Sequence, residues 1–179
     1  ASLCAKFWQA ACVLDRFDFQ LLNLLQRDDS RTAHSLAADV PLSPSAIARR
    51  LRRLRADGII ARTIALLSPR LTDRRLRAMV FIQLSEHAAL KGKTALEKRL
   101  LGSPYVQFCY EISGPHDIVA LFDCESMSAF NRACDELLAS PPTVRRYETH
   151  FLKREVKFAP FVELDPGDPI PNPLFNPLD

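Results

Sequence analysis

The chain has 179 residues and a mass of 20.2 kDa; 47% of the residues are hydrophobic, 25% are charged, and the net charge is +3. This composition is typical of one large globular domain or two small ones, and it excludes a chain that is disordered throughout. No run reaches the roughly 18 apolar residues of a membrane span, and five cysteines without a CxxC pair favour the reduced cytoplasm over a secreted disulfide framework.

Residues 1–13 are predicted to form an N-terminal extension, either an extra helical turn or a loose lead. Lys6 and Gln9 interrupt its apolar residues, and no charged segment leads into an apolar one. The segment therefore does not resemble a signal peptide.

Three short helices are predicted next. The first covers Asp15–Gln26, with leucines at helical spacing and acidic residues at its start. Thr32 is predicted to cap a second helix that ends at Pro41. Ser43 followed by Pro44 predicts a third, because a serine hydroxyl caps a helix well and proline suits its first position.

The third helix has two different faces. A rotation of about 100° per residue places Ile47, Leu51 and Leu54 on one buried stripe. The opposite side carries small residues first and long cations later: Ser45, Ala46, Arg49, Arg52 and Arg53. Such a helix fits a DNA major groove, which it enters N-terminus first. A three-helix bundle that is merely rich in arginine is the alternative.

The positive charge is concentrated in one segment. Residues 41–77 hold ten arginines, no lysines and only two aspartates, a net +8, which leaves −5 for the rest of the chain. This asymmetry favours a polyanionic partner, and arginine fits phosphate and guanine edges better than lysine does. A solvated basic face is the alternative. The apolar residues between Ile59 and Leu66, around Arg62, predict a strand pair or wing after the third helix.

The C-terminal half is predicted to be an α+β domain. Apolar runs and turn residues indicate strands at 77–84, 105–112, 117–122 and 144–156, with helices at 88–101 and 126–138. The order β-α-β-β-α-β is that of a ferredoxin-like domain, whose two helices cover one face of an antiparallel sheet. The other face needs a cover, so we expect oligomerisation.

Six of the 13 prolines lie between Pro160 and Pro177, which predicts an extended arm outside the core. This arm either lies on a partner subunit or is disordered. The expected organisation is an extension at 1–13, a winged helix-turn-helix domain at 14–62, a linker strand and loop at 63–76, a ferredoxin-like domain at 77–159 and a proline-rich tail at 160–179.

These residues together resemble the leucine-responsive/asparagine-synthase-regulator (Lrp/AsnC) family of transcriptional regulators, over about 14–157. In the N-terminal half the matching residues are Leu14, Asp15, Asp18, Leu21, Leu22, Leu25, Gln26, Leu36, Ala37, Leu42, Ser43, Pro44, Ser45, Arg50, Arg53, Leu54, Gly58, Ile59 and Ile60. In the C-terminal half they are Cys109, Tyr110, Gly114, Asp117, Val144, Thr149 and Lys157. The departures are Asp29-Ser30 for Gly-Arg, Arg31 for an apolar residue, Pro41 for glycine, Arg55 for glutamate and Thr63 for an aromatic residue. The loop between the first two helices is therefore expected to be built differently.

The resemblance implies a transcriptional regulator that binds specific sequences in double-stranded DNA. It also implies a homodimer that assembles further, often into octamers. In complex with DNA we expect four residues to lie near base edges: Ser43, Ser45, Ala46 and Arg49. Four arginines are expected mostly to contact phosphates: Arg50, Arg52, Arg53 and Arg62. It also implies that an amino acid or related metabolite binds between subunits at the matching loop, Ser113, Gly114, Pro115, His116 and Asp117. Gly114 would let backbone amides approach a carboxylate, and Asp117 would accept from an ammonium group. The alternative is that Gly114 only makes the turn and Asp117 caps it.

Three other functions are weighed against the regulator. Haem-pathway decarboxylases share this architecture but carry His-Asn-Tyr-x-Arg and Trp-Phe motifs, whereas Val106–Tyr110 has no such histidine or tryptophan, so no enzymatic activity is expected. Cys109, His116, Asp117 and Cys124 flank one hairpin, but their spacing matches no zinc pattern, and we expect no metal and no cofactor. A third alternative is a ligand-binding scaffold with a degenerate DNA-binding domain. The net charge of +8 in residues 41–77 argues against it, because that charge favours DNA binding.

Overall fold

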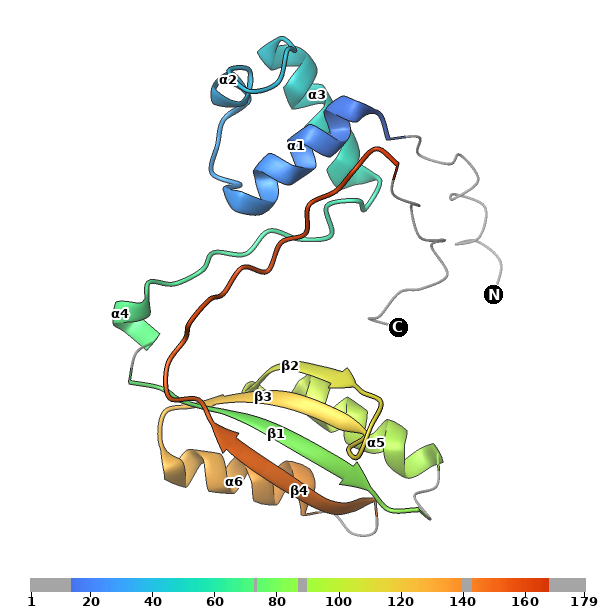
Figure 1. Ribbon diagram of the computed structural model, residues 1–179, viewed down its shortest axis with the longest axis vertical. Coiled ribbons are helices and arrows are strands. Elements are labelled where there is room, and N and C mark those ends of the chain that lie inside the picture. Colours follow the sequence, from blue (N-terminus) through green and yellow to red (C-terminus); the bar gives the residue numbers. More distant parts are fainter. Residues whose placement is uncertain (1–13, 73, 87–89, 140–142, 168–179) are drawn as a thin grey trace. The chain divides into compact units, whose positions relative to one another are not determined.

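The computed structural model describes residues 14–72, 74–86, 90–139 and 143–167 (Figure 1). The chain divides into two compact units. We call them the helical unit (14–65 and 159–167 of the described residues) and the sheet unit (the described residues within 66–158). The predicted N-terminal extension and the tail beyond residue 167 lie outside the described residues. No helix within the described ranges is both long enough and apolar enough to cross a membrane.

The helical unit contains α1 (Arg16–Arg27), α2 (Ala33–Leu36) and α3 (Pro44–Ala56). α1 begins with a capping box, in which the Asp15 carboxylate accepts from the backbone N–H of Phe17 and Asp18, and the Asp18 carboxylate accepts from the N–H of Asp15. This arrangement satisfies backbone donors that a helix N-terminus leaves without partners. Its apolar residues then form one core with those of α2 and α3, including the fully buried Leu21, Leu36, Ile47 and Leu54.

Two predicted caps are confirmed, although α2 is shorter than expected. The Thr32 hydroxyl accepts from the Ser35 N–H, and the Ser43 hydroxyl accepts from the Ala46 N–H at 3.3 Å. α2 ends at Leu36, and a turn bond from the Val40 N–H to the Leu36 carbonyl continues the chain without further helix.

The prediction of a strand pair or wing between Ile59 and Leu66 is wrong, because the described residues 59–68 form no strand. Gly58 ends α3 at a φ of 72°, a conformation that favours glycine. The Ile60 N–H then donates to the Leu54 carbonyl at 3.1 Å. Ile59 and Ile60 pack on the helical core, so their apolar side chains find burial without a partner strand.

The sheet unit has the predicted ferredoxin-like order of elements, with one unpredicted short helix, α4 (Pro69–Thr72). Its remaining elements are β1 (Leu76–Leu84), α5 (Leu90–Gly102), β2 (Val106–Glu111), β3 (Ile118–Cys124), α6 (Met127–Leu138) and β4 (Val144–Phe151). The antiparallel sheet has the order β2-β3-β1-β4. β4 ends at Phe151, five residues before the predicted Val156, because Phe151 pairs with Ala78 close to the start of β1.

The two faces of this sheet have different surroundings. α5 and α6 pack on one face (Figure 1), where Ala78, Val80 and Ile82 of β1 are fully buried. Antiparallel partners share a face, so Phe81 lies on the opposite face together with Val119 and Glu148. By the same register Met79, Phe108, Tyr110, Leu121 and His150 also lie there. No helix of the described sheet unit covers this second, largely apolar face.

Candidate nucleic-acid interface and effector loop

The outer face of α3 presents exposed cations. Arg49 and Arg52 are exposed on the side away from the buried stripe, and Arg62 is exposed in the segment that follows. Within the described ranges none of these three guanidinium groups has an ion-pair or hydrogen-bond partner. Ser45 is exposed near the start of the helix, and its hydroxyl lies 3.1 Å from that of Ser43. These side chains are available to a ligand of the helix.

Arg50 and Arg53, which the sequence predicts as phosphate anchors, contact two acids at the start of α1, its N-cap Asp15 and Asp18. Arg53 Nη2 lies 2.6 Å from Asp18 Oδ2. Arg50 Nη1 lies 3.0 Å from Asp18 Oδ1 and 2.8 Å from Asp15 Oδ2. The Asp18 side chain is fully buried. This difference from the prediction arises because helical spacing gives the direction of an arginine but not the acids that a neighbouring helix brings to it. The pairs join α1 to α3.

The protonation behaviour of this cluster agrees with its geometry. Burial alone would raise the pKa of the Asp15 carboxyl, but the backbone N–H groups of Asp18 and Phe17 and the Arg50 guanidinium outweigh burial and lower that pKa below its usual value. Desolvation would lower the pKa of Arg50, but its hydrogen bonds to Asp18 and Asp15 raise it. Both groups are therefore held in their charged forms.

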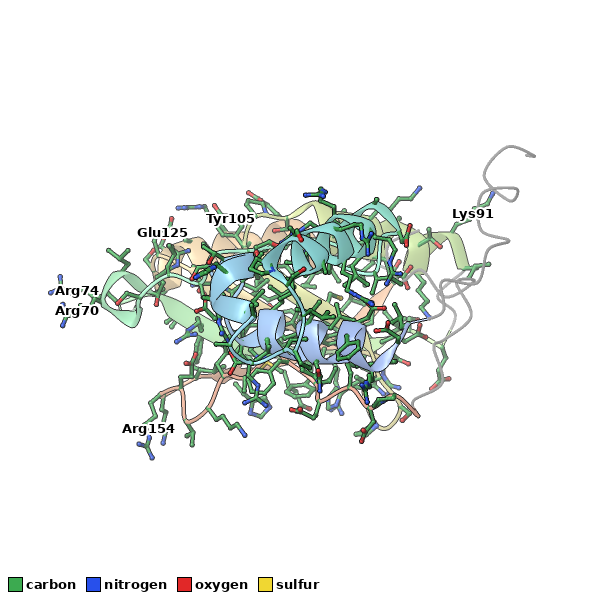
Figure 2. All side chains as sticks on the ribbon, turned by 90° about the horizontal axis from the view of Figure 1, so that it is seen from above. Arg70, Arg74, Lys91, Tyr105, Glu125 and Arg154 are labelled. Carbon is green, nitrogen blue, oxygen red and sulfur yellow. The ribbon has the colours of Figure 1, made fainter. Side chains whose placement is uncertain are left out.

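Other arginines of the +8 segment are also paired with acids from outside it. Arg55 Nη2 lies 3.1 Å from Asp29 Oδ1, and Arg77 Nη1 lies 3.3 Å from Glu155 Oε2. Arg75 pairs with Asp123. The charge that reaches solvent is thus smaller than the sequence count suggests. Besides the α3 cations it includes two arginines that extend outward at α4, labelled in Figure 2, Arg70 and Arg74.

The predicted effector loop connects β2 to β3. Ser113, Gly114 and Pro115 are exposed, and Gly114 has a φ of 129° that a side chain would strain. His116 turns away from the loop toward the uncovered sheet face. Its Nε2 lies 3.5 Å from Glu148 Oε1.

Asp117 holds the end of the β1–β3 pair together. Its Oδ2 accepts from the Leu84 N–H at 2.7 Å, while its own N–H donates to the Ile82 carbonyl at 2.9 Å. The structural role weighed for Asp117 is therefore present. This bond orients the Asp117 carboxylate toward the backbone at the end of β1.

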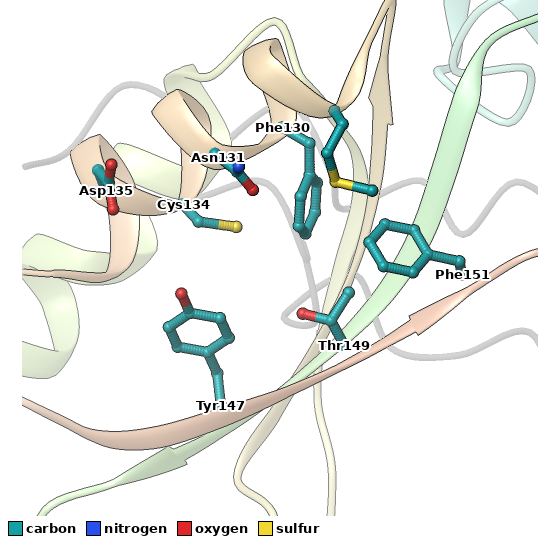
Figure 3. A pocket seen from close by; sticks show the side chains of 8 residues that line it. Phe130, Asn131, Cys134, Asp135, Tyr147, Thr149 and Phe151 are labelled. Carbon is teal, nitrogen blue, oxygen red and sulfur yellow. The ribbon is translucent and has the colours of Figure 1, made fainter.

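A groove that sequence reasoning missed lies between α6 and β4 (Figure 3). Its volume is about 500 Å³, and no residue of the predicted effector loop lines it. Its lining residues are Met127, Phe130, Asn131, Cys134, Asp135, Tyr147, Thr149 and Phe151. No sequence signal points to it, because its two sides are distant in the chain and their apolar residues are typical of an ordinary core.

Burial raises the pKa of the cysteine thiols in the sheet unit. The pKa of the Cys134 thiol rises to about 11, which favours its protonated form at neutral pH. Burial likewise raises the pKa of Cys109 and Cys124. Within the described ranges no group of three or more His, Cys, Asp or Glu side chains is placed to hold a metal ion.

Both halves of the chain match known domain families. An AsnC-type helix-turn-helix domain matches residues 14–55, and an Lrp/AsnC ligand-binding domain matches residues 77–160. The transcriptional regulatory protein DoeX of Halomonas elongata is 31% identical over 144 residues, which are 80% of this chain and 90% of the relative. The leucine-responsive regulatory protein of Escherichia coli K12 is 33% identical over 147 residues, 80% of this chain and 87% of the relative. A crystal structure of a Neisseria meningitidis transcriptional regulator in complex with L-methionine is 28% identical, with a TM-score of 0.74, and covers 82% of this chain and 94% of its own.

Proposed function

The chain belongs to the Lrp/AsnC family of transcriptional regulators, and we propose that it binds double-stranded DNA through α3 under the control of an amino acid or related metabolite bound by the sheet unit. The observation that supports this most is the division of the α3 arginines. Arg50 and Arg53 hold the helical unit together, while Arg49 and Arg52 are exposed and have no partner within the described chain. Such a regulator works where the chromosome is, so we propose a cytoplasmic location.

In the proposed complex α3 enters the major groove with its N-terminus first. Ser43, Ser45, Ala46 and Arg49 lie near base edges, where the small early residues allow close approach and Arg49 reaches a guanine. Arg52 and Arg62 contact phosphates, which fix the position of the protein but carry no sequence information. The ion pairs of Arg50 and Arg53 give these two residues a supporting role, in which they set the direction of the helix.

We further propose a homodimer that assembles into higher oligomers. The uncovered sheet face carries Phe81, Phe108, Leu121 and Tyr110, and Tyr110 is 61% exposed. An apolar sheet face of this kind is stabilised by a second copy. Two α3 helices of a dimer then reach successive major grooves of a pseudo-palindromic site, with half-sites about one helical turn apart or a multiple of it.

The proposed effector site is the loop of residues 113–117. The Neisseria relative was crystallised with L-methionine, which supports an amino acid as the class of ligand. Gly114 leaves space above the loop backbone, and the oriented Asp117 carboxylate suits an ammonium group. Effector binding would alter the geometry of the assembly and hence the spacing of the two α3 helices, with a coupling of about 1–3 kcal/mol.

A salt titration of DNA binding tests the DNA-binding proposal. Arginine contacts release counterions from DNA, so the logarithm of the binding constant is expected to fall linearly with the logarithm of salt concentration. The slope of this line should be about −0.9 for each phosphate contacted. Binding to no fragment of a genomic library at low salt would contradict the proposal.

Asp117→Asn separates the two roles of this residue. The amide oxygen still accepts from the Leu84 N–H but without the charge of the carboxylate, so we expect the sheet unit to lose about 1 kcal/mol of stability and to stay folded, whereas the charge needed for an ammonium group is lost. In a thermal-shift screen of the common amino acids, any shift of the wild-type protein should disappear in this variant. An undiminished shift would remove Asp117 from the effector site.

A further inference from the structure

Residues 161–165 run as an extended segment along α1, antiparallel to it. Asn23 Nδ2 donates to the Leu164 carbonyl at 2.9 Å, and Asn23 Oδ1 accepts from the Leu164 N–H at 3.0 Å. Gln26 repeats this arrangement with Val162: its Nε2 donates to the carbonyl at 2.9 Å and its Oε1 accepts from the N–H at 3.0 Å. Each side-chain amide thus binds both backbone groups of one residue.

The spacing on both sides accounts for this pairing. Asn23 and Gln26 are three residues apart on a helix and therefore share a face. Val162 and Leu164 are two residues apart in an extended segment, so their backbone groups point to the same side. An amide side chain has one donor end and one acceptor end, which matches the N–H and C=O of a residue whatever its side chain is. The contact recognises extended backbone.

Side chains add apolar and charged contacts at the same place. Leu164 is half-buried against the core of the helical unit. The Arg27 guanidinium lies 4.9 Å from the centre of the Phe161 ring, and its Nη2 lies 2.7 Å from Glu163 Oε2. Both members of that ion pair are mostly exposed, so the pair adds little to the stability of the contact. The hydrogen bonds of the two side-chain amides and the burial of Leu164 therefore hold the segment on α1.

We propose that α1 carries a docking site for extended backbone whose occupant is residues 161–165 of this chain. The chain leaves the helical unit near residue 65, forms the sheet unit and returns near residue 159. The chain therefore connects the two units twice, and docking of residues 161–165 anchors the second connection on α1. The predicted proline-rich arm is, over residues 161–165, a part of the helical unit rather than a free tail.

Hydrogen exchange of backbone amides in the full chain, measured by NMR without DNA, tests this proposal independently of any DNA binding. The N–H groups of Val162 and Leu164 should exchange about tenfold more slowly than that of Glu163, which points to the other side of the segment. Equal and unprotected exchange at all three positions would overturn the proposal.

Variants on α1 extend the test. Asn23→Ala should abolish protection at Leu164 and Gln26→Ala should abolish it at Val162. Gln20→Ala is the matched control, because Gln20 is an exposed glutamine of the same helix whose side chain has no hydrogen-bond partner within the described chain. If Gln20→Ala reduced protection as much as Gln26→Ala, the proposal would be wrong.

Variants of the segment itself test backbone recognition without touching α1. Val162→Pro removes the N–H that donates to Gln26 and is expected to release the segment, with faster proteolytic cleavage after residue 158. Val162→Ala keeps the N–H, and because this side chain is 64% exposed the variant should behave as wild type. Equal cleavage of the two variants would contradict backbone recognition.

Discussion

Asp18→Asn is expected to destabilise the helical unit by about 2–3 kcal/mol. The fully buried carboxylate accepts from two guanidinium groups and from the Asp15 N–H, so the variant loses the charged partner of Arg50 and Arg53 and weakens the capping box. Removing one partner of a buried ion pair costs more when the remaining charge is also buried. Here Arg50 and Arg53 are 21% and 42% exposed, and water partly solvates them, which keeps the effect below the largest known cases.

Native-state hydrogen exchange at the buried amides of Leu21 and Leu25 measures this loss within the helical unit alone, and about 30- to 150-fold faster exchange is expected. Asp29→Asn is the matched control, because Asp29 pairs with Arg55 at the surface and the change should cost about 0.5 kcal/mol or less. Equal effects of the two variants would show that the buried cluster does not hold α1 to α3.

Arg49→Ala is expected to weaken binding to the preferred DNA site by about 1–3 kcal/mol and to reduce the preference for that site. Arg52→Ala should weaken binding to preferred and random DNA alike, because a phosphate contact is independent of sequence. A site selected from a random pool and a scrambled fragment of equal length are compared for each variant.

The control for both variants is Arg55→Ala, which removes an α3 arginine that is paired with Asp29. It should change DNA affinity less than either variant does. If Arg49→Ala and Arg52→Ala had the same effect on both DNA fragments, the division between base-reading and phosphate-binding arginines would be wrong.

Features set by neighbouring residues in the chain could be predicted from the sequence. The caps at Thr32 and Ser43 are of this kind, because each depends on residues at most three positions away. The order of strands and helices after residue 76 follows from apolar runs separated by turn residues, and it is also confirmed.

Features that depend on distant partners could not be predicted. The sequence shows that Arg53 lies outside the buried stripe of α3. It does not show that the carboxylate of Asp18, 35 residues earlier in the chain, lies next to the Arg53 guanidinium. The docking of Val162 on Gln26 spans 136 residues. The prediction of a wing was wrong for a related reason. An apolar run forms a strand only where a partner strand is available, and here Ile59 and Ile60 pack on the helical core instead.

The salt dependence of DNA binding by the Arg49→Ala/Arg52→Ala double variant shows whether the exposed arginines of α3 contact the DNA backbone and bases. We expect the double variant to bind DNA more weakly than the wild type, and the slope of log binding constant against log salt concentration to be less negative by about 0.9 for each phosphate contact that is lost. A double variant that folds normally and binds DNA with the affinity and salt dependence of the wild type would contradict this expectation.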